Sequence, residues 1–459
     1  SLEHENEMLA QLLECDKQQY EQAKKDMEKI NIRYHDLKQQ YSRATGEERF
    51  LRYFERAADA VAEDNLSCSG SLGQHSAGYF MESYAPSGSY QELSMHNLAA
   101  AYLNYRDLSC AKSALTQKME DSIRRAVRYE SLYWLPQPDG GVVSPTSMNL
   151  RAPTGMMSNC GYPGMFLAAI AFPEAKGLLR LLPYDAENYS YALTMPHIAL
   201  NNPALAQRVL LEGFQNKDTR VYGMGGAWTP RLYEAYALQE RTAEESVPPV
   251  YETEKAWDLD GLLAWKKNGW YVMTHYATPA AGGSLRSGLP AVVWREETGA
   301  VLLSMNPAED AEADGAAYSC LTLEYADGTV IRTGLENGTL SWLTPGESYR
   351  ITQAVGADAQ AAITTDISGD ELSFSVLLMA ENAPVGAYAS LPINVAGLET
   401  EFSEGTLTCR SDGGAIQIRC GSGARWNETA LPTGNSVRIQ TLEIPLEAGV
   451  KSTIFFTVK

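Results

Sequence analysis

The sequence lacks several features that would assign it to a common functional class. No run approaches the roughly 20 consecutive apolar residues of a membrane-spanning helix, and no charged-then-apolar stretch typical of a secretion signal opens the chain. Basic residues are scarce, because 37 Lys and Arg stand against 57 Asp and Glu and give a formal net charge of -20. Phosphate binding needs clustered Lys and Arg, so a nucleic-acid partner is not expected.

Histidine and cysteine are also few, and their spacing matches no common metal site. The six histidines and seven cysteines form no CxxC, HxH or HExxH pattern, so neither a metal nor another cofactor is predicted. Reduced thiols are expected rather than a disulfide framework, because a 459-residue chain with 44% hydrophobic residues can build its cores without such links. Cys409 and Cys420 could still pair across neighbouring strands.

Residues 1–44 are almost free of Gly and Pro and are rich in Glu, Gln, Lys and Leu, which predicts a long exposed helix. From Leu9 to Tyr41, apolar residues recur in alternating steps of four and three, with Asp16 as the single polar exception. This spacing predicts a coiled coil, and residues 9–41 offer an interface for a homodimer.

Within this helix, the segment INIRYHDLKQQ (30–40) resembles the dimerisation and phosphoacceptor helix of GHKL sensor histidine kinases. The resemblance implies that His35 is a phosphoacceptor, lying beside the apolar seam and exposed to solvent. Nothing later in the chain resembles the ATP-binding domain of that family. The alternative interpretation is a solvated oligomerisation helix without phosphate transfer.

Residues 47–243 are predicted to form a helical domain. Apolar residues at three- and four-residue spacings predict helices at 48–65, 93–105, 113–135, 163–172, 203–214 and 230–239. The loops between them are long and rich in Gly and Pro, as in Gln137–Gly141 and Tyr222–Trp228. Loops of this size on a helical frame are common places for a binding site.

After a proline-marked linker at 244–256, residues 257–459 change to short alternating runs separated by Gly, Asn and Asp. Strands are predicted at 269–276, 291–295, 300–305, 319–325, 329–333, 372–379, 415–419, 437–443 and 452–458. Because no helical spacers separate these strands, a large antiparallel β-sandwich is expected. The predicted fold class is therefore multidomain α+β.

Particular strings in the helical part and the first sandwich strands resemble those of known enzymes. They are GYF (78–80), GSYQE (88–92), MHNL (95–98) and WYVMTHY (270–276), the last of which resembles the first strand of a sandwich. Together with the order of domains, residues 47–459 resemble the toroid-plus-sandwich polysaccharide lyases, including the heparinase II/III-like group. The resemblance implies an α/α-toroid-like domain, here short for a complete toroid, and lyase activity on a polysaccharide. The His-Ala-Asp type of metal-binding run found in that family is not seen.

Cleavage by β-elimination needs a base for the proton next to a uronate carboxylate, an acid for the leaving oxygen, and a group that neutralises the carboxylate. His96 is the predicted base, and Tyr90 or Tyr162 the predicted acid. Arg151, or Asn97 with Asn159, would neutralise the carboxylate. Further predicted substrate-binding residues are Glu92, Asn149, His275 and three tryptophans that would stack on sugar rings, Trp134, Trp228 and Trp270.

Each of these residues also has a structural explanation. His96 lies among apolar residues and could be a core histidine, and Arg151 could form a salt bridge that fixes its loop. Asn159 and Tyr162 could cap a helix. His275 could be an ordinary residue of the sandwich.

Three further functions remain open. The first is a glycoside hydrolase using two carboxylates, with Glu92 and Glu82 as the pair. The second is a non-catalytic glycan-binding or scaffold protein with an N-terminal dimerisation helix. The third is signalling through the N-terminal helix and His35. A secreted or periplasmic location is expected if the lyase interpretation is right.

Overall fold

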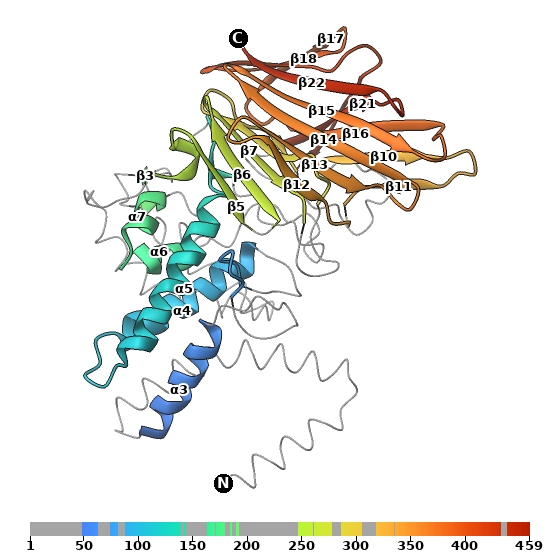
Figure 1. Ribbon diagram of the computed structural model, residues 1–459. Helices are drawn as coiled ribbons and strands as arrows, with labels where there is room; N and C mark the ends of the chain where they lie inside the picture. The colour runs from blue at the N-terminus through green and yellow to red at the C-terminus, as the bar shows by residue number, and fades with distance from the viewer. Residues whose placement is uncertain are drawn as a thin grey trace, which may run out of the picture.

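A computed structural model gives the arrangement of the chain (Figure 1). The structure describes residues 48–62, 74–80, 88–138, 142–143, 163–169, 171–179, 184–185, 190–191, 247–259, 261–277, 286–304, 318–334, 336–432 and 438–459. The coiled coil predicted for residues 1–44, with His35, lies outside these residues. In Figure 1 the helices form one layer, and a much larger body of strands covers one end of it.

The described helices pack around a core of their own. They are α3 (Glu48–Val61), α4 (Gly88–Tyr105), α5 (Ser113–Ser131), α6 (Pro163–Ala169) and α7 (Pro173–Leu179). Phe54, Met95, Tyr105, Met119 and Ile123 lie at the centre of this core and are almost fully buried. Helices α3 and α5, which supply Phe54, Met119 and Ile123, are amphipathic, whereas α4, which supplies Met95 and Tyr105, has no single apolar face. These helices do not by themselves establish the predicted α/α-toroid.

Several predicted helix boundaries are wrong, for identifiable reasons. Helix α4 begins at Gly88 rather than at residue 93, so His96 lies in the middle of the helix. Helix α5 ends at Ser131 rather than at residue 135, because Leu132, Tyr133 and Leu135 turn toward the core shared with the sandwich, while Trp134 stays in the helical core. The helix predicted at 163–172 ends at Ala169, and a second short helix that was not predicted, α7, begins at Pro173. The helices predicted at 203–214 and 230–239 lie outside the described residues.

The strands form two large antiparallel sheets packed face to face. Their bounds are β5 (Lys255–Leu259), β6 (Leu262–Lys267), β7 (Trp270–His275), β8 (Pro290–Arg295), β9 (Gly299–Leu303), β10 (Cys320–Glu324), β11 (Val330–Arg332), β12 (Thr339–Thr344), β13 (Ser348–Ala354), β14 (Ala359–Ser368), β15 (Glu371–Ala380), β16 (Gly386–Asn394), β17 (Glu399–Ser403), β18 (Thr406–Ser411), β19 (Gly414–Arg419), β20 (Arg425–Pro432), β21 (Arg438–Pro445) and β22 (Lys451–Val458). Two short hairpins pair β1 (Leu135–Pro136) with β2 (Val142–Val143), and β3 (Tyr184–Asp185) with β4 (Ser190–Tyr191).

One sheet has ten strands in the order β11-β10-β16-β9-β8-β7-β6-β5, and β21 joins β16 and carries β20. The other has eight, in the order β12-β13-β14-β15-β22-β19-β18-β17. Strand β16 is the branching element of the ten-stranded sheet, because it pairs with β10 through residues 386–390, with β9 at Ile393 and with β21 through residues 388–394.

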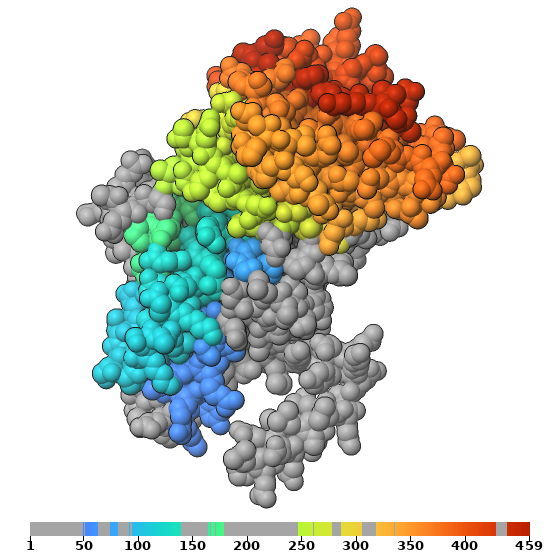
Figure 2. Space-filling model, in the orientation of Figure 1, coloured from blue at the N-terminus to red at the C-terminus, as the bar shows by residue number. Residues whose placement is uncertain are grey.

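The strands β6 to β9 are buried on both faces, and this positions the helices. Alternate residues of a strand point to opposite faces. On β7, Trp270 and Val272 belong to the core between the two sheets, whereas Tyr271 and Met273 belong to a second core that also contains Tyr129 and Tyr133. The second core is therefore the junction between the helical layer and the sandwich. Figure 2 shows the resulting contact between the blue-green helices and the yellow-green strands.

The sandwich predicted for residues 257–459 is confirmed as two large antiparallel sheets, with three corrections. The segment 270–276 is not the first strand, because β5 and β6 precede it, and β5 begins inside the predicted linker. Strands β12 to β14, β16 to β18 and β20 were also not predicted. Cys409 and Cys420 are both free, since Cys409 lies opposite Ile416 and the Cys420 thiol donates to the carbonyl oxygen of Gly405.

No helix among the described residues is long and apolar enough to cross a membrane. The described residues also contain no group of three or more His, Cys, Asp or Glu side chains placed to bind a metal ion.

Candidate functional site

The end of helix α5 is fixed to the ten-stranded sheet by three hydrogen bonds. The hydroxyl of Tyr271 donates to the carbonyl oxygen of Leu132 at 2.8 Å, and the indole nitrogen of Trp294 donates to that of Pro136 at 2.7 Å. The amide of Ala300 donates to Oε1 of Gln137 at 3.3 Å. All three donors come from sheet strands, so the helical layer and the sandwich meet in a defined register.

A chain of buried polar side chains lies within this junction. The hydroxyl oxygens of Tyr129 and Tyr133 are 2.8 Å apart, and that of Tyr133 lies 3.1 Å from Nε2 of His275 on β7. Burial lowers the pKa of His275 to about 3, so its ring is neutral near pH 7 and is a weak base. Burial raises the pKa of both tyrosines, so both hydroxyls keep their protons.

Glu130, between the two tyrosines in sequence, is also buried, and burial raises the pKa of its carboxyl group to about 8. A hydrogen bond from Trp134 acts in the opposite direction. The carboxyl group is therefore largely protonated at neutral pH. These four groups of the junction are therefore mostly uncharged at neutral pH, as expected for groups removed from water.

A short hairpin, residues 74–80, closes the same junction. Gln74 donates through Nε2 to the carbonyl oxygens of Gly78 and Ser122, and the ring of His75 stacks on that of Tyr79 with centroids 4.6 Å apart. Gly78 has φ +112, and a Cβ there would lie 2.2 Å from the carbonyl oxygen of Arg125. Only glycine allows the hairpin to approach α5 so closely.

The structure describes only some of the predicted site residues. His96 is 7% exposed within α4, and its neighbour Asn97 is half-buried. Tyr90 and Glu92 belong to the same helix, but their side chains are not described. The remaining predicted residues lie outside the described chain, namely Glu82, Asn149, Arg151, Asn159, Tyr162 and Trp228.

Two of the predicted stacking residues are part of the cores. Trp134 and Trp270 are both 0% exposed. The guanidinium carbon of Arg295 lies 5.0 Å from the Trp270 ring centroid, and Phe456 approaches the same tryptophan edge-on. Neither indole presents a face to solvent in this arrangement. His275, predicted to bind substrate, is instead hydrogen-bonded inside the junction.

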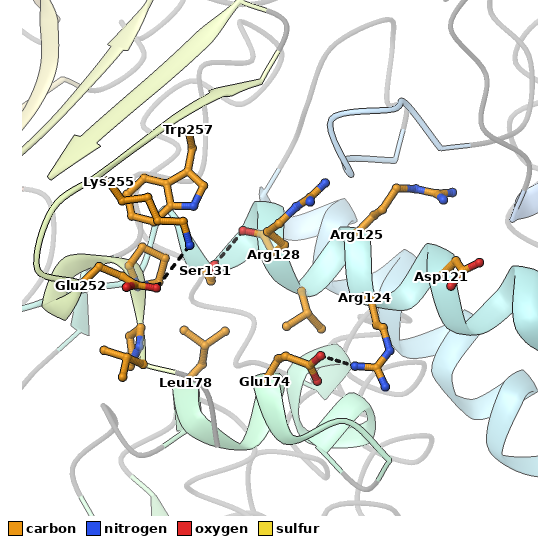
Figure 3. A pocket seen from close by; sticks show the side chains of 14 residues that line it. Asp121, Arg124, Arg125, Arg128, Ser131, Glu174, Leu178, Glu252, Lys255 and Trp257 are labelled. Atoms are coloured by element: carbon orange, nitrogen blue, oxygen red, sulfur yellow. Dashed lines mark hydrogen bonds and ion pairs between the residues drawn. The ribbon is translucent and has the colours of Figure 1, made fainter. Parts of the chain in front are cut away.

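Beside the buried junction lies an open groove of about 520 Å³ between α5, α7 and residues 247–257 (Figure 3). Its cationic residues are Arg124, Arg125, Arg128 and Lys255, and its acidic residues are Asp121, Glu174 and Glu252. Trp257 forms part of the wall, and Lys255 Nζ lies 5.2 Å from its ring centroid. The groove is cationic on balance, in a chain whose formal net charge is -20.

Neither this groove nor the role of the junction tyrosines was predicted from the sequence. The pattern RRAVR at 124–128 was an available signal, because residues three and four apart on a helix are neighbours on its surface, which places Arg128 beside both Arg125 and Arg124. The contact between Tyr133 and His275 had no such signal, since the two residues are 142 apart in the sequence.

Comparison with known proteins finds no matching family model and no matching curated sequence. Solved structures do match. Paenibacillus xanthan lyase is similar over 94% of this chain and 44% of its own, with a TM-score of 0.53 and 8% identity. Streptomyces coelicolor chondroitin AC lyase, solved with chondroitin sulphate, gives a TM-score of 0.49 and 12% identity over 89% of this chain and 57% of its own. A heparinase III gives 0.48 and 10% identity over 90% and 56%.

The chain is structurally similar to the toroid-plus-sandwich polysaccharide lyases. At these identities the similarity concerns the fold alone. This chain spans between about half and two-thirds of the length of the first structures it matches. The resemblance drawn from the sequence is therefore confirmed at the level of layout, whereas the activity and the site residues stay predictions.

Proposed function

We propose that this protein is a carbohydrate-active enzyme of the polysaccharide-lyase type, which cleaves a uronate-containing glycan by β-elimination. The observation that carries the proposal is the arrangement of a helical layer on a two-sheet sandwich, which is similar to that of xanthan lyase over 94% of this chain. The cationic groove at the same junction adds support, because an acidic glycan needs local positive charge on an acidic protein.

The chemistry needs no reactant other than the glycan. A base removes the proton on the ring carbon next to the uronate carboxylate, and the electron pair forms a double bond to the neighbouring carbon. The bond from that carbon to the glycosidic oxygen breaks, and an acid protonates the oxygen. Cations or amides beside the carboxylate stabilise the negative charge that develops.

For the base we favour His96 over His275. The pKa of about 3 makes the His275 imidazole too weak a base for this proton, and its Nε2 faces Tyr133. Tyr90 or Tyr162 would supply the acid, and Arg151, helped by Asn97 or Asn159, would neutralise the carboxylate. Glu92, Asn149 and Trp228 would bind neighbouring sugar units.

The domain organisation belongs to the same proposal. Residues 1–44 would form a coiled-coil dimerisation helix, 47–243 a toroid-like helical domain, 244–256 a linker, and 257–459 the sandwich. Sedimentation of the full chain beside a chain beginning at residue 45 tests the first part. A dimer that becomes a monomer on truncation supports it, and an unchanged mass contradicts it.

The activity is tested by absorbance at the ultraviolet band of an unsaturated uronate, with the full chain against a panel of uronate polysaccharides. His96→Ala and Arg151→Ala should each abolish the signal. Arg350→Ala, which changes an exposed arginine on β13, should retain it.

The alternatives give different outcomes in this assay. New reducing ends without ultraviolet absorbance would indicate hydrolysis, with Glu92 and Glu82 as the carboxylates to test. Binding of the glycan without any turnover would indicate a glycan-binding protein.

A further inference from the structure

The groove beside the junction contains two arginines, Arg125 and Arg128, with no acidic partner among the residues that the structure describes. Arg124 forms ion pairs with Glu120, at 3.1 Å, and with Glu174 on α7. Lys255 pairs with Glu252 at 3.5 Å. Arg125 donates through Nε to Oε1 of Gln74 at 3.1 Å. Arg128 is exposed on α5 and makes no such contact within the described chain.

The acidic residues of the groove are already engaged. Glu174 accepts a hydrogen bond from Arg124, and Glu252 accepts one from Lys255. Oδ1 of Asp121 accepts from Nε2 of Gln117 at 2.9 Å. Arg125 and Arg128 are therefore the two cations of the groove that form no ion pair with a carboxylate of the described residues. Figure 3 shows the side chain of Arg124 turned toward Glu174, whereas the side chains of Arg125 and Arg128 point away from Glu174.

The wall opposite α5 is less polar. Trp257, Val247 and Pro248 come from the segment that leads into the sandwich, and Leu178 comes from α7. A charged floor beside an indole and aliphatic surface suits a ligand that has an anionic group and a less polar body. The guanidinium fork of arginine matches the geometry of carboxylate and sulfate oxygens.

We propose that this groove is a binding site for a carboxylate or sulfate group of an acidic saccharide, with Arg128 as the principal contact. The ligand would touch α5 and the 247–257 segment together, and would therefore stabilise the attachment of the helical layer to the sandwich. The anionic group follows from the groove itself, whereas the saccharide as its carrier rests on the proposed function.

The test measures binding of a short chondroitin sulfate oligosaccharide to the full chain by calorimetric titration, with and without Arg128→Gln. Loss of a charge-assisted hydrogen-bonding pair should weaken binding about tenfold. The matched control is Arg56→Gln, which removes an exposed helical arginine on α3 outside the groove. It should leave the affinity unchanged. Arg128→Lys, which keeps the charge but loses the fork, should give an intermediate affinity.

Two further ligands separate the sources of the anionic group. A desulfated and carboxyl-reduced oligosaccharide should not bind. Inorganic sulfate at the same sulfate concentration should bind much more weakly than the oligosaccharide. If inorganic sulfate alone binds as tightly and depends on Arg128, the groove is an oxyanion site and the saccharide assignment is overturned.

Binding that Arg128→Gln leaves intact, or no binding by the wild type, would overturn the site itself. Saturating oligosaccharide should also raise the melting temperature of the wild type more than that of Arg128→Gln, because a ligand that binds only the folded state stabilises it. The absorbance assay is independent of this outcome. Binding that depends on Arg128 without turnover would support the groove and contradict the lyase proposal, and turnover with binding insensitive to Arg128 would do the reverse.

Discussion

Tyr133 and His275 are separated by 142 residues in sequence, yet the tyrosine hydroxyl lies 3.1 Å from Nε2 of the histidine. One residue follows helix α5 and the other ends strand β7, so this contact joins the helical layer to the sandwich. Both side chains are buried. The polar atoms of this pair therefore depend on each other.

Tyr133→Phe tests that dependence. The substitution removes the hydroxyl that lies between Tyr129 and His275, so the Tyr129 hydroxyl and Nε2 of His275 each lose a buried hydrogen-bond partner. This should lower the free energy of unfolding by about 1–3 kcal/mol. Urea denaturation measures the change. Tyr251→Phe is the control, because Tyr251 is 41% exposed, and its loss should be small. Equal losses of unfolding free energy in the two variants would show that the Tyr133 hydroxyl stabilises the protein no more than an exposed one does.

His275→Gln should flatten the dependence of stability on pH below about pH 6.5. The folded protein keeps the ring neutral down to about pH 3, whereas the unfolded chain binds a proton near 6.5. Stability is therefore lost as pH falls through this window, by at most about 1.4 kcal/mol per pH unit. The free energy of unfolding of the wild type and of His275→Gln is measured between pH 4 and 7. In the difference between the two curves, the titration of all other groups cancels. Parallel curves would contradict the burial of a neutral histidine.

Glu130→Gln should act with the opposite sign. The carboxyl group has a pKa of about 8 in the folded protein against an ordinary value of 4.5, so stability is lost as pH rises between these values. Glutamine stays neutral and avoids this cost, so the variant should be more stable at neutral pH by on the order of 1–3 kcal/mol. The gain should be larger at pH 8 than at pH 5. A gain that does not depend on pH would indicate that Glu130 is not the titrating group.

Gly78→Ala should be strongly destabilising, and Gly328→Ala provides a control. Both glycines have positive φ, +112 and +86, but only at Gly78 would a Cβ meet backbone, 2.2 Å from the carbonyl oxygen of Arg125. Gly328 has no atom within 4 Å of that position. Gly328→Ala should cost about 1 kcal/mol, and Gly78→Ala clearly more. Thermal unfolding compares them. Similar losses would mean that the hairpin shifts away from α5 without penalty.

The sequence predicted those parts of the fold that have a local signal. Helices α3 and α5 begin where their apolar spacing begins, and strands such as β19 and β22 follow alternating runs between turns. Strand β6 was missed because both faces are buried, so LLAWKK shows no alternation. Strands β13 and β14 were missed although they alternate, because their many Thr, Gln and Ala residues weaken the hydrophobic contrast.

The candidate site was less predictable because its parts meet only in the folded chain. His275 was predicted to bind substrate, but its environment is set by the end of α5, which the sequence gives no reason to place beside β7. The groove could have been found in part, since RRAVR at 124–128 places Arg124 and Arg128 one turn apart. Its other wall, at residues 247–257, depends on how the chain enters the sandwich.

The branching position of β16 has a consequence for local unfolding of the ten-stranded sheet and for the order in which its strands assemble. Strands β5 to β9 pair in the order in which they follow one another along the chain and contact the helical layer, whereas β10, β11, β20 and β21 reach that part of the sheet through β16. Amide protons of β16 should therefore be among the slowest to exchange with solvent in the sheet, because releasing them disconnects two groups of strands at once. In kinetic terms, the antiparallel run from residue 255 to 303 can assemble from near neighbours. The other strands of the ten-stranded sheet, β10, β11, β20 and β21, can join this run only after β16 (residues 386–394) has paired with it.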